Sequence, residues 1–333
     1  MKLISLFTGA GGLDLGFKKA GFDITWANEF DKTIWDTFKT NFLHTRLDKR
    51  SITDIDSSEI PDGVGIIGGP PCQSWSEAGA MRGIKDKRGQ LFYEYIRILR
   101  NKRPLFFLAE NVSGILASRH KEAFEEIINQ FKGLDYNVNY LLLNAHDYNV
   151  PQDRKRVIIV GYHKKMRKEF IFPKKSSKHP TLKNAISDLR RARPAKDYNK
   201  ANSENELWSP NHEYMNGGFS TMYMSRNRVR SWGEPSFTIQ AGGRHAPIHP
   251  RAPKMKFIEQ NKRVFVPGKE HLYRRLSVRE CARIQTFPDN FIFKYENISD
   301  GYKMVGNAVP VEFARRLALG IANDLRDFKN TNV

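Results

Sequence analysis

The chain has 333 residues, 40% of them hydrophobic, which is enough to bury a substantial core and excludes disorder for most of its length. Its 55 lysines and arginines outnumber 36 aspartates and glutamates, and the net charge of +19 indicates a polyanionic partner, whether DNA, RNA or an anionic membrane. Residues 176–275 alone carry a net charge of +11, so the basic excess is concentrated in one segment.

The two cysteines, Cys72 and Cys281, are far apart and lack the spacing of metal ligands, so neither a disulfide framework nor a zinc site is predicted. The apolar stretch at residues 3–7 is too short for a signal peptide, and no stretch is long enough to span a membrane. We therefore expect a cytoplasmic protein that holds no metal.

The chain begins with a predicted strand at residues 1–7, a glycine-rich turn at residues 8–12 and a helix that follows at once. Glycines let a backbone approach a ligand at a helix N-terminus. Glu29, at the end of a second strand over residues 24–27, is an acid that suits ribose hydroxyls. The pattern predicts a nucleotide-like cofactor, and it fits NAD as well as an adenosine-bearing methyl donor.

A third strand, residues 64–67, runs into two glycines, two prolines and then Cys72. Glycine and proline neither continue a strand comfortably nor begin a helix, and ligands of open α/β sheets bind just beyond such strand ends. Cys72 is therefore a candidate nucleophile, and the alternative is a buried cysteine acting as a small hydrophobe. Residues 76–89 lack an apolar period and are predicted to form a loop that could close over a substrate.

Further strands and helices alternate, which predicts an α/β fold with a doubly wound, mostly parallel sheet. Glu110 and Asn111 follow one of these strands, so polar side chains lie at a second strand end. The further strands are expected over residues 104–109, 138–144 and 157–161, and the helices around residues 33–42, 91–99, 124–131, 276–285 and 313–321.

Beyond residue 162 the sequence becomes rich in Lys and Arg and is punctuated by Pro and Gly, so a second domain is expected there. Arg226, Arg228 and Arg230 alternate beside aromatic residues, and Arg244 follows. This run fits a nucleic-acid surface and a solvated charged edge strand equally well.

Three histidines of the basic segment and the second cysteine of the chain are not expected to do chemistry. His212, His245 and His249 lack paired ligand spacing and are predicted to lie on the surface or on DNA. Cys281 stands among apolar residues of a predicted helix, which favours structural burial.

Taken together, these stretches closely resemble the cytosine-C5 DNA methyltransferases, particularly the bacterial restriction-modification enzymes that read GGCC. The resemblance covers almost the whole chain, with the motifs in the family's order. They are Phe7-Thr8-Gly9-Ala10-Gly11-Gly12, Pro71-Cys72-Gln73, Glu110-Asn111-Val112, Gln152-Asp153-Arg154-Lys155-Arg156, Arg275-Leu276 through Glu280 with Arg283, Gln285 and Phe287-Pro288, and Gly306-Asn307-Ala308-Val309.

The resemblance implies a role for each catalytic residue. The Cys72 thiolate would add to cytosine C6, which turns the ring into an enamine whose C5 can accept a methyl group. Negative charge then accumulates toward N3 and O2, where a protonated Glu110 and Arg156 would stabilise it. Arg154 would orient Cys72 or a phosphate, and Asn111 would brace the site.

The resemblance also implies S-adenosylmethionine as the methyl donor. The implicated residues are Phe7, Gly9, Gly11, Gly12, Glu29, Leu91 and Asn307. Ser51 stands where the family usually has an acid that binds the adenine amino group, and Val64 replaces a common Asp. Neither departure touches the reacting atoms.

We expect a catalytic and S-adenosylmethionine-binding domain of residues 1–172 plus 303–333, a target-recognition domain of residues 173–275, and a hinge with a motif-bearing helix at residues 276–302. The target cytosine would flip out of duplex DNA into the pocket beside Cys72. The expected protein is a bacterial, nucleoid-associated monomer that works alongside a restriction endonuclease without necessarily contacting it.

Three alternatives remain open. A tRNA cytosine-C5 methyltransferase would share Cys72, Glu110 and Arg156, although the long basic segment favours DNA. A non-catalytic DNA-binding regulator would have no need of this intact set, and an NAD-dependent oxidoreductase would have no use for Cys72. Within GGCC the first cytosine is the expected target, and arginines of the basic segment would contact either guanines or phosphates.

Overall fold

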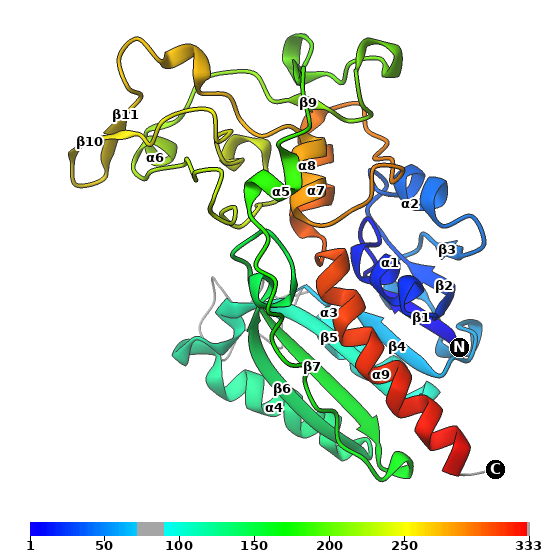
Figure 1. The fold of residues 1–333 in the computed structure, drawn as a ribbon. Helices are drawn as coiled ribbons and strands as arrows, with labels where there is room; N and C mark the ends of the chain where they lie inside the picture. The colour runs from blue at the N-terminus through cyan, green and yellow to red at the C-terminus, as the bar shows by residue number, and fades with distance from the viewer. Residues whose placement is uncertain (72–89, 332–333) are drawn as a thin grey trace.

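The computed structural model describes residues 1–71 and 90–331, and its centre is a seven-stranded sheet (Figure 1). The strands are β1 (Lys2–Leu6), β2 (Asp23–Asn28), β3 (Arg46–Asp48), β4 (Gly65–Gly68), β5 (Phe106–Val112), β6 (Tyr136–Asn144) and β7 (Lys155–His163). Their order in the sheet is β3-β2-β1-β4-β5-β7-β6. The first five pair in parallel, whereas β7 runs antiparallel to both β5 and β6. The predicted mostly parallel α/β sheet is confirmed.

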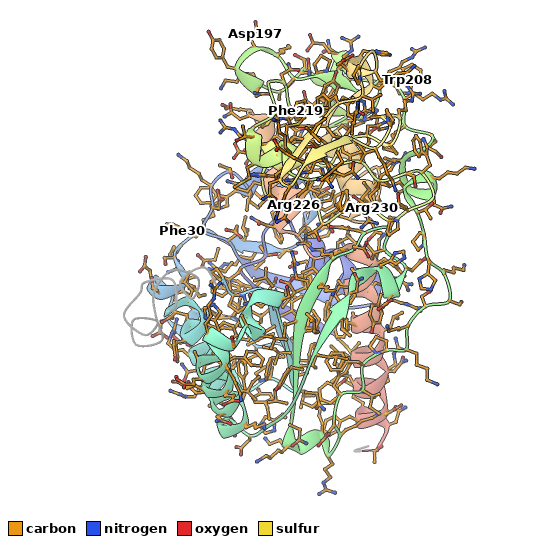
Figure 2. The ribbon with its side chains drawn as sticks, turned by 90° about the vertical axis from the view of Figure 1, so that its left-hand side faces the viewer. Phe30, Asp197, Trp208, Phe219, Arg226 and Arg230 are labelled. Atoms are coloured by element: carbon orange, nitrogen blue, oxygen red, sulfur yellow. The ribbon has the colours of Figure 1, made fainter. Side chains whose placement is uncertain are left out.

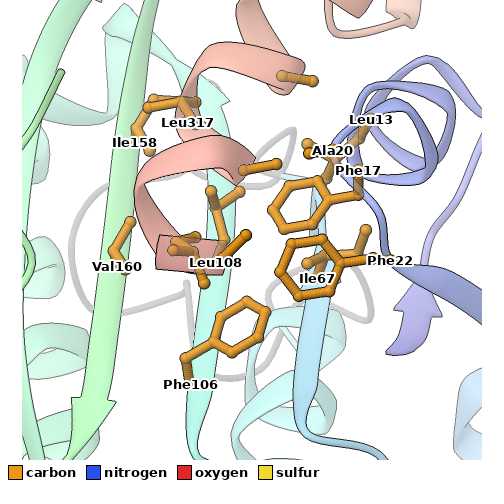
Figure 3. Close-up of a cluster of buried hydrophobic side chains, with 14 of the residues drawn as sticks. Leu13, Phe17, Ala20, Phe22, Ile67, Phe106, Leu108, Ile158, Val160 and Leu317 are labelled. Carbon is orange, nitrogen blue, oxygen red and sulfur yellow. The ribbon is translucent and has the colours of Figure 1, made fainter. Parts of the chain in front are cut away.

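Helices cover both faces of this sheet because its central strands are apolar on both sides. On one face, α1 (Gly12–Lys19) and α9 (Val311–Thr331) pack on Phe106 and Leu108 of β5 (Figure 3). On the other face, α3 (Gln90–Lys102) and α4 (Lys121–Gly133) pack on Phe107. Alternate residues of one strand therefore point into two different cores, as the period of two requires.

The C-terminal helix α9 completes the core that the N-terminal segment begins (Figure 1). A Cβ atom at Gly16 of α1 would lie 2.4 Å from the Cβ of Ala314, so the two helices are too close for any side chain at this position. Within the described residues, no helix is both long and apolar enough to cross a bilayer. The return of the chain to this core supports a split catalytic domain, whose boundaries stay a prediction.

The upper lobe of Figure 1 contains short elements joined by long connections. They are α5 (Leu182–Ile186), β8 (Arg193–Pro194), β9 (Glu213–Tyr214), α6 (Thr221–Met224), β10 (Lys256–Glu259), β11 (Lys262–Val264), α7 (Val278–Ile284) and α8 (Ile298–Asn307). Two clusters of buried apolar residues hold them together, one around α7 and α8 and a smaller one around Tyr223. The charged run at residues 225–232 forms no strand, so an edge strand there is ruled out.

A buried polar network lies inside this lobe, at the start of α7. Arg274 donates two hydrogen bonds to Glu280, of 2.8 and 2.7 Å, and Ser277 caps the helix. Nδ1 of His212 lies 2.9 Å from the Ser277 hydroxyl, and Nε2 of His249 lies 3.6 Å from Glu280. His212 and His249 are 0% and 2% exposed, so the prediction that they lie on the surface or on DNA is wrong. A buried carboxylate needs such polar neighbours.

Burial and hydrogen bonding together set the pKa values of this network. It would raise the pKa of Glu280, but the hydrogen bonds from Arg274 outweigh it and hold that pKa at about 2. Burial also lowers the pKa of His249 to about 4, so its ring is neutral at pH 7. Cys281 is fully buried beside them, as predicted, and burial raises the pKa of its thiol.

The structure contains elements that the sequence analysis does not predict, and β3 and α8 are two of them. Strand β3, which pairs with β2, has three residues, too short a run for an apolar period to be visible. Helix α8 contains two glycines, which lower helix propensity. Gly301 faces the ring of Tyr295, where a Cβ atom would come within 2.6 Å, so packing in the lobe selects this glycine.

Candidate active site

The ends of β4 and β5 meet at the segment that leads to Cys72. The two strands are parallel neighbours, with Gly68 opposite Ala109. Asn111, at the end of β5, donates a 2.9 Å hydrogen bond from Nδ2 to the carbonyl of Pro70. Asn111 thus fixes the backbone two residues before Cys72. Cys72 itself and the predicted loop at residues 76–89 lie outside the described residues.

Glu110 and Arg156 form an ion pair beside this segment. Nε of Arg156 lies 2.8 Å from Oε1 of Glu110, and the two side chains are 12% and 11% exposed. The antiparallel register places Glu110 opposite Ile158 and Val112 opposite Arg156, so both charged side chains leave the same face of the sheet. Adjacent carboxyl and guanidinium groups can address two neighbouring polar atoms on one edge of a planar ring.

Arg154 is buried, with 1% of its surface exposed, and donates hydrogen bonds to three backbone carbonyls. The acceptors are Ile239 at 3.0 Å, Gly306 at 2.9 Å and Ala308 at 3.0 Å. Burial lowers the pKa of Arg154 to about 9, which still leaves it charged at neutral pH. The expected phosphate contact is therefore wrong, because DNA cannot reach this side chain. Its predicted action on Cys72 is not tested, since that residue is not described.

Glu29 connects the glycine-rich turn to the end of β2. Its two carboxylate oxygens accept hydrogen bonds of 2.8 Å from the backbone N–H groups of Gly9 and Asp31. Burial raises the pKa of Glu29, although both N–H groups act in the opposite direction. A Cβ atom at Gly9, where φ is +57°, would meet no atom within 4 Å, so the turn has an open face beside Glu29. Open backbone next to an acidic side chain fits an adenosine-bearing ligand.

Gly11 and Gly12 are required by packing within the protein rather than by close approach of a ligand. A Cβ atom at Gly11 would lie 2.3 Å from the ring of Phe42, and one at Gly12 would lie 2.4 Å from the carbonyl oxygen of Val309. The Gly12 contact also brings the segment that carries Asn307, which is exposed, up to the turn. Residues at the two ends of the chain are thus brought together at one site.

Aromatic and apolar side chains complete this side of the sheet. Phe7 and Leu91 are partly buried against the same apolar cluster. Phe30, which the sequence analysis does not single out, is 69% exposed directly after Glu29 (Figure 2). An exposed aromatic face can stack on a purine ring, and an aromatic residue after the acid was a signal that could have identified it. The hydroxyl oxygens of Ser51 and Thr53 lie 2.7 Å apart and share a hydrogen bond.

Comparison with known proteins identifies the family. A family model described as C-5 cytosine-specific DNA methylase matches residues 1–323. The chain belongs to this family. Type II methyltransferase M.MthTI of Methanothermobacter thermautotrophicus is 57% identical over 330 residues, covering 99% of both chains, and M.FnuDI of Fusobacterium nucleatum is 56% identical over 331 residues, covering 98% of this chain and 96% of the relative.

A solved structure agrees in fold. It is a candidate DNA modification methyltransferase encoded within an E. coli prophage, with a TM-score of 0.77 and 25% identity, covering 98% of this chain and 99% of that chain. The protein is therefore a C-5 cytosine DNA methyltransferase of the type II restriction-modification class. Enzymes of this family use S-adenosylmethionine as methyl donor. In residues 1–71 and 90–331, no three His, Cys, Asp or Glu side chains gather as metal ligands.

Two of the four candidate DNA-binding arginines of this methylase are held by the protein. Arg228 donates a 2.9 Å hydrogen bond to the carbonyl of Tyr223, and its guanidinium lies 4.8 Å from the centre of that ring. Arg230 pairs with Asp153 at 3.1 Å and with Glu234 at 3.2 Å. These contacts occupy donors that a guanine or a phosphate would need.

The other two candidates, Arg226 and Arg244, are exposed, and neither has a hydrogen-bond or ion-pair partner among the described residues. Arg226 lies in the lower part of the upper lobe, above the sheet (Figure 2). Arg244 lines two adjoining cavities of about 500 and 490 Å³, which also share Met215 and Ser299. Their guanidinium groups are therefore available to a polyanion.

Proposed function

We propose that this methyltransferase modifies C5 of a cytosine that is flipped out of duplex DNA, within the sequence GGCC, through a covalent bond between Cys72 and C6. The observation that carries the proposal is the Glu110–Arg156 pair, next to the Pro70 carbonyl that Asn111 holds. Glu110 and Asn111 at the end of β5, and Arg156 at the start of β7, thus lie together beside the segment that leads to Cys72. A duplex hides the reacting atoms of cytosine, which is why the base must leave the stack.

Each residue has a definite task in the proposed reaction. The Cys72 thiolate forms the bond to C6, and the electron pair displaced from the C5–C6 double bond moves toward N3 and O2. Glu110 donates a proton to N3, and Arg156 donates hydrogen bonds to O2. When bound, S-adenosylmethionine supplies the electrophilic methyl group. Loss of the C5 proton to a base then lets the C6–sulfur bond break and releases the thiolate, and return of the N3 proton to Glu110 restores neutral, methylated cytosine and the acid.

The methyl donor would be held at the glycine-rich turn. Glu29 would accept hydrogen bonds from ribose hydroxyls through lone pairs that Gly9 and Asp31 leave unused. The exposed ring of Phe30 would stack on the adenine, and Asn307 would close the site from the C-terminal side. Phe7, Leu91, Gly11 and Gly12 would shape the turn from within.

Sequence reading would come from the basic segment. An arginine pairs through two hydrogen bonds with O6 and N7 of guanine in the major groove. Arg226 and Arg244 are the stronger candidates, since Arg228 and Arg230 already have partners in the protein. The proposed role is protection of host DNA from a companion endonuclease, by a monomer that acts on duplex DNA inside the cell.

The test is methyl transfer from a labelled donor to duplex GGCC, to its single-base variants and to tRNA, followed by bisulfite sequencing. We expect methylation of the first cytosine of GGCC alone, and none with Cys72→Ser, because a hydroxyl is a far weaker nucleophile than a thiolate at neutral pH. Duplex with 5-fluorocytosine at the target should trap Cys72, because fluorine blocks the final elimination. A trapped peptide containing the buried Cys281, or preferred methylation of tRNA, would refute the proposal.

A further inference from the structure

Two glutamine side chains form the centre of a buried polar junction between the lobes. Gln152 and Gln285 are both 0% exposed, and Nε2 of Gln152 donates a 2.8 Å hydrogen bond to Oε1 of Gln285. The remaining amide oxygen of Gln152 accepts from the N–H of Ile239, at 2.8 Å. Gln285 in turn donates to the carbonyls of Val305 and Ala308, at 2.8 and 3.2 Å. Each buried amide therefore bridges separate chain segments.

Arg154 joins the same junction with three hydrogen bonds to the carbonyls of Ile239, Gly306 and Ala308. It has no ion-pair partner among the described residues, so its charge is compensated chiefly by the backbone carbonyls, with Glu110 acting on it without direct contact. A buried cation without a carboxylate is costly unless its donors are well placed, which makes the arrangement sensitive to small displacements of these carbonyls.

The junction touches one segment on the donor side and one on the DNA side. Residues 305–309 include Asn307 and the Val309 carbonyl that packs on the glycine-rich turn at Gly12. Residues 236–241 lead directly to Arg244. The backbones of the two segments are also in direct contact, since a Cβ atom at Gly306 would lie 2.2 Å from the carbonyl oxygen of Gln240. A shift of either segment must therefore be taken up by the other or by the three polar side chains.

We propose that Gln152, Arg154 and Gln285 are positioning residues that couple methyl-donor binding to placement of the DNA-contacting segment at residues 240–244. This inference rests on the proposed function, because it takes the glycine-rich turn as the donor site and Arg244 as a DNA contact. Donor binding that fixes the position of residues 305–309 also fixes the position of the carbonyls that Arg154 and Gln285 bind. The linkage is reciprocal, so DNA binding must favour the donor by the same factor.

The test compares Arg154→Lys with a matched control, Arg279→Lys. Arg279 is also fully buried and also bonded to carbonyls, those of Pro210 at 2.8 Å and Phe291 at 2.9 Å, but it makes no hydrogen bond to residues 305–309. Lysine keeps the charge in both variants and loses the planar fork that binds several carbonyls at once. The measurement is the dissociation constant of a GGCC duplex with and without S-adenosylhomocysteine, the demethylated form of the donor.

We expect S-adenosylhomocysteine to tighten DNA binding of the wild type and of Arg279→Lys by a similar factor, within the range of about 5–150 that is usual for linked sites. In Arg154→Lys that factor should fall to near one, although the dissociation constant without S-adenosylhomocysteine changes little. A merely structural role would instead weaken DNA binding equally in both conditions.

Two results would overturn the coupling. One is that S-adenosylhomocysteine tightens DNA binding by folded Arg154→Lys as much as it does by the wild type. The other is that S-adenosylhomocysteine leaves DNA binding by the wild type unchanged. If Arg154→Lys does not fold, Thr238→Val replaces it, since the Thr238 hydroxyl bonds the carbonyl of Asp153 at the rim of the junction. A factor unchanged by Thr238→Val would then refute the inference, and a reduced factor would support it. Normal GGCC methylation by the wild type leaves the proposed function intact in each case.

Discussion

Replacing Gly11 with alanine is expected to damage both stability and donor binding, and the structure allows the cost to be divided. Gly11 has φ of +86°, a conformation that costs an L-residue about 1–2 kcal/mol. The new Cβ atom would also lie 2.3 Å from the ring of Phe42, which stacks on Phe38 with centroids 4.4 Å apart. Such overpacking typically costs about 1–3 kcal/mol. We expect the free energy of unfolding to fall by about 2–5 kcal/mol.

Gly21→Ala provides the matched control. Gly21 has nearly the same φ, +93°, but a Cβ atom there would meet nothing within 4 Å. Only the backbone cost of about 1–2 kcal/mol should remain, with donor affinity unchanged. Guanidinium chloride denaturation would give the stabilities, and calorimetric titration with S-adenosylhomocysteine would give the affinities. If Gly11→Ala proved no more destabilising than Gly21→Ala, and bound the donor equally well, the assignment of Gly11 to packing beneath the donor turn would fail.

Three further predictions concern acid stability, catalysis and sequence reading. Burial lowers the pKa of His249 to about 4, so the stability that its neutral ring contributes is present above pH 6.5 and is lost as the pH falls toward 4. The loss amounts to up to about 3 kcal/mol. It should be smaller in His249→Gln when the free energy of unfolding is measured across that pH window. Glu110→Gln should slow single-turnover methylation by about 10²–10⁴-fold, because an amide cannot protonate N3, and an unchanged rate with weaker donor binding would contradict the acid role. Arg226→Ala and Arg244→Ala should each relax discrimination at one base pair by about 1–3 kcal/mol. Arg230→Ala, which removes an ion-paired side chain, should change discrimination less. Equal losses of activity on every substrate, with a weaker salt dependence, would show that these arginines contact phosphates only.

Local sequence patterns were sufficient for the fold class and for most of its elements. An apolar run followed by glycines identified β1 and its turn, and the same logic identified β4 ahead of Pro70. The order of the motifs indicated the family across almost the whole chain. Glu110 and Asn111 could be placed at a strand end because strand length and polarity are properties of neighbouring residues.

The partners of the site residues were decided only by tertiary structure. Glu110 meets Arg156, 46 positions later, because β7 runs antiparallel beside β5 with one particular register. Arg154, two residues from Arg156, turns inward to carbonyls that arrive from residues 239–308.

The sequence by itself therefore determined which chemical groups the protein carries and on which kinds of element they stand. It did not determine that Gly11 makes room for Phe42, or that His249 is buried near Glu280. Backbone preference and apolar period act over a few residues and can be read along the chain. Burial, ion pairing and steric fit depend on segments that meet only after the sheet has closed, so these properties belong to the tertiary structure.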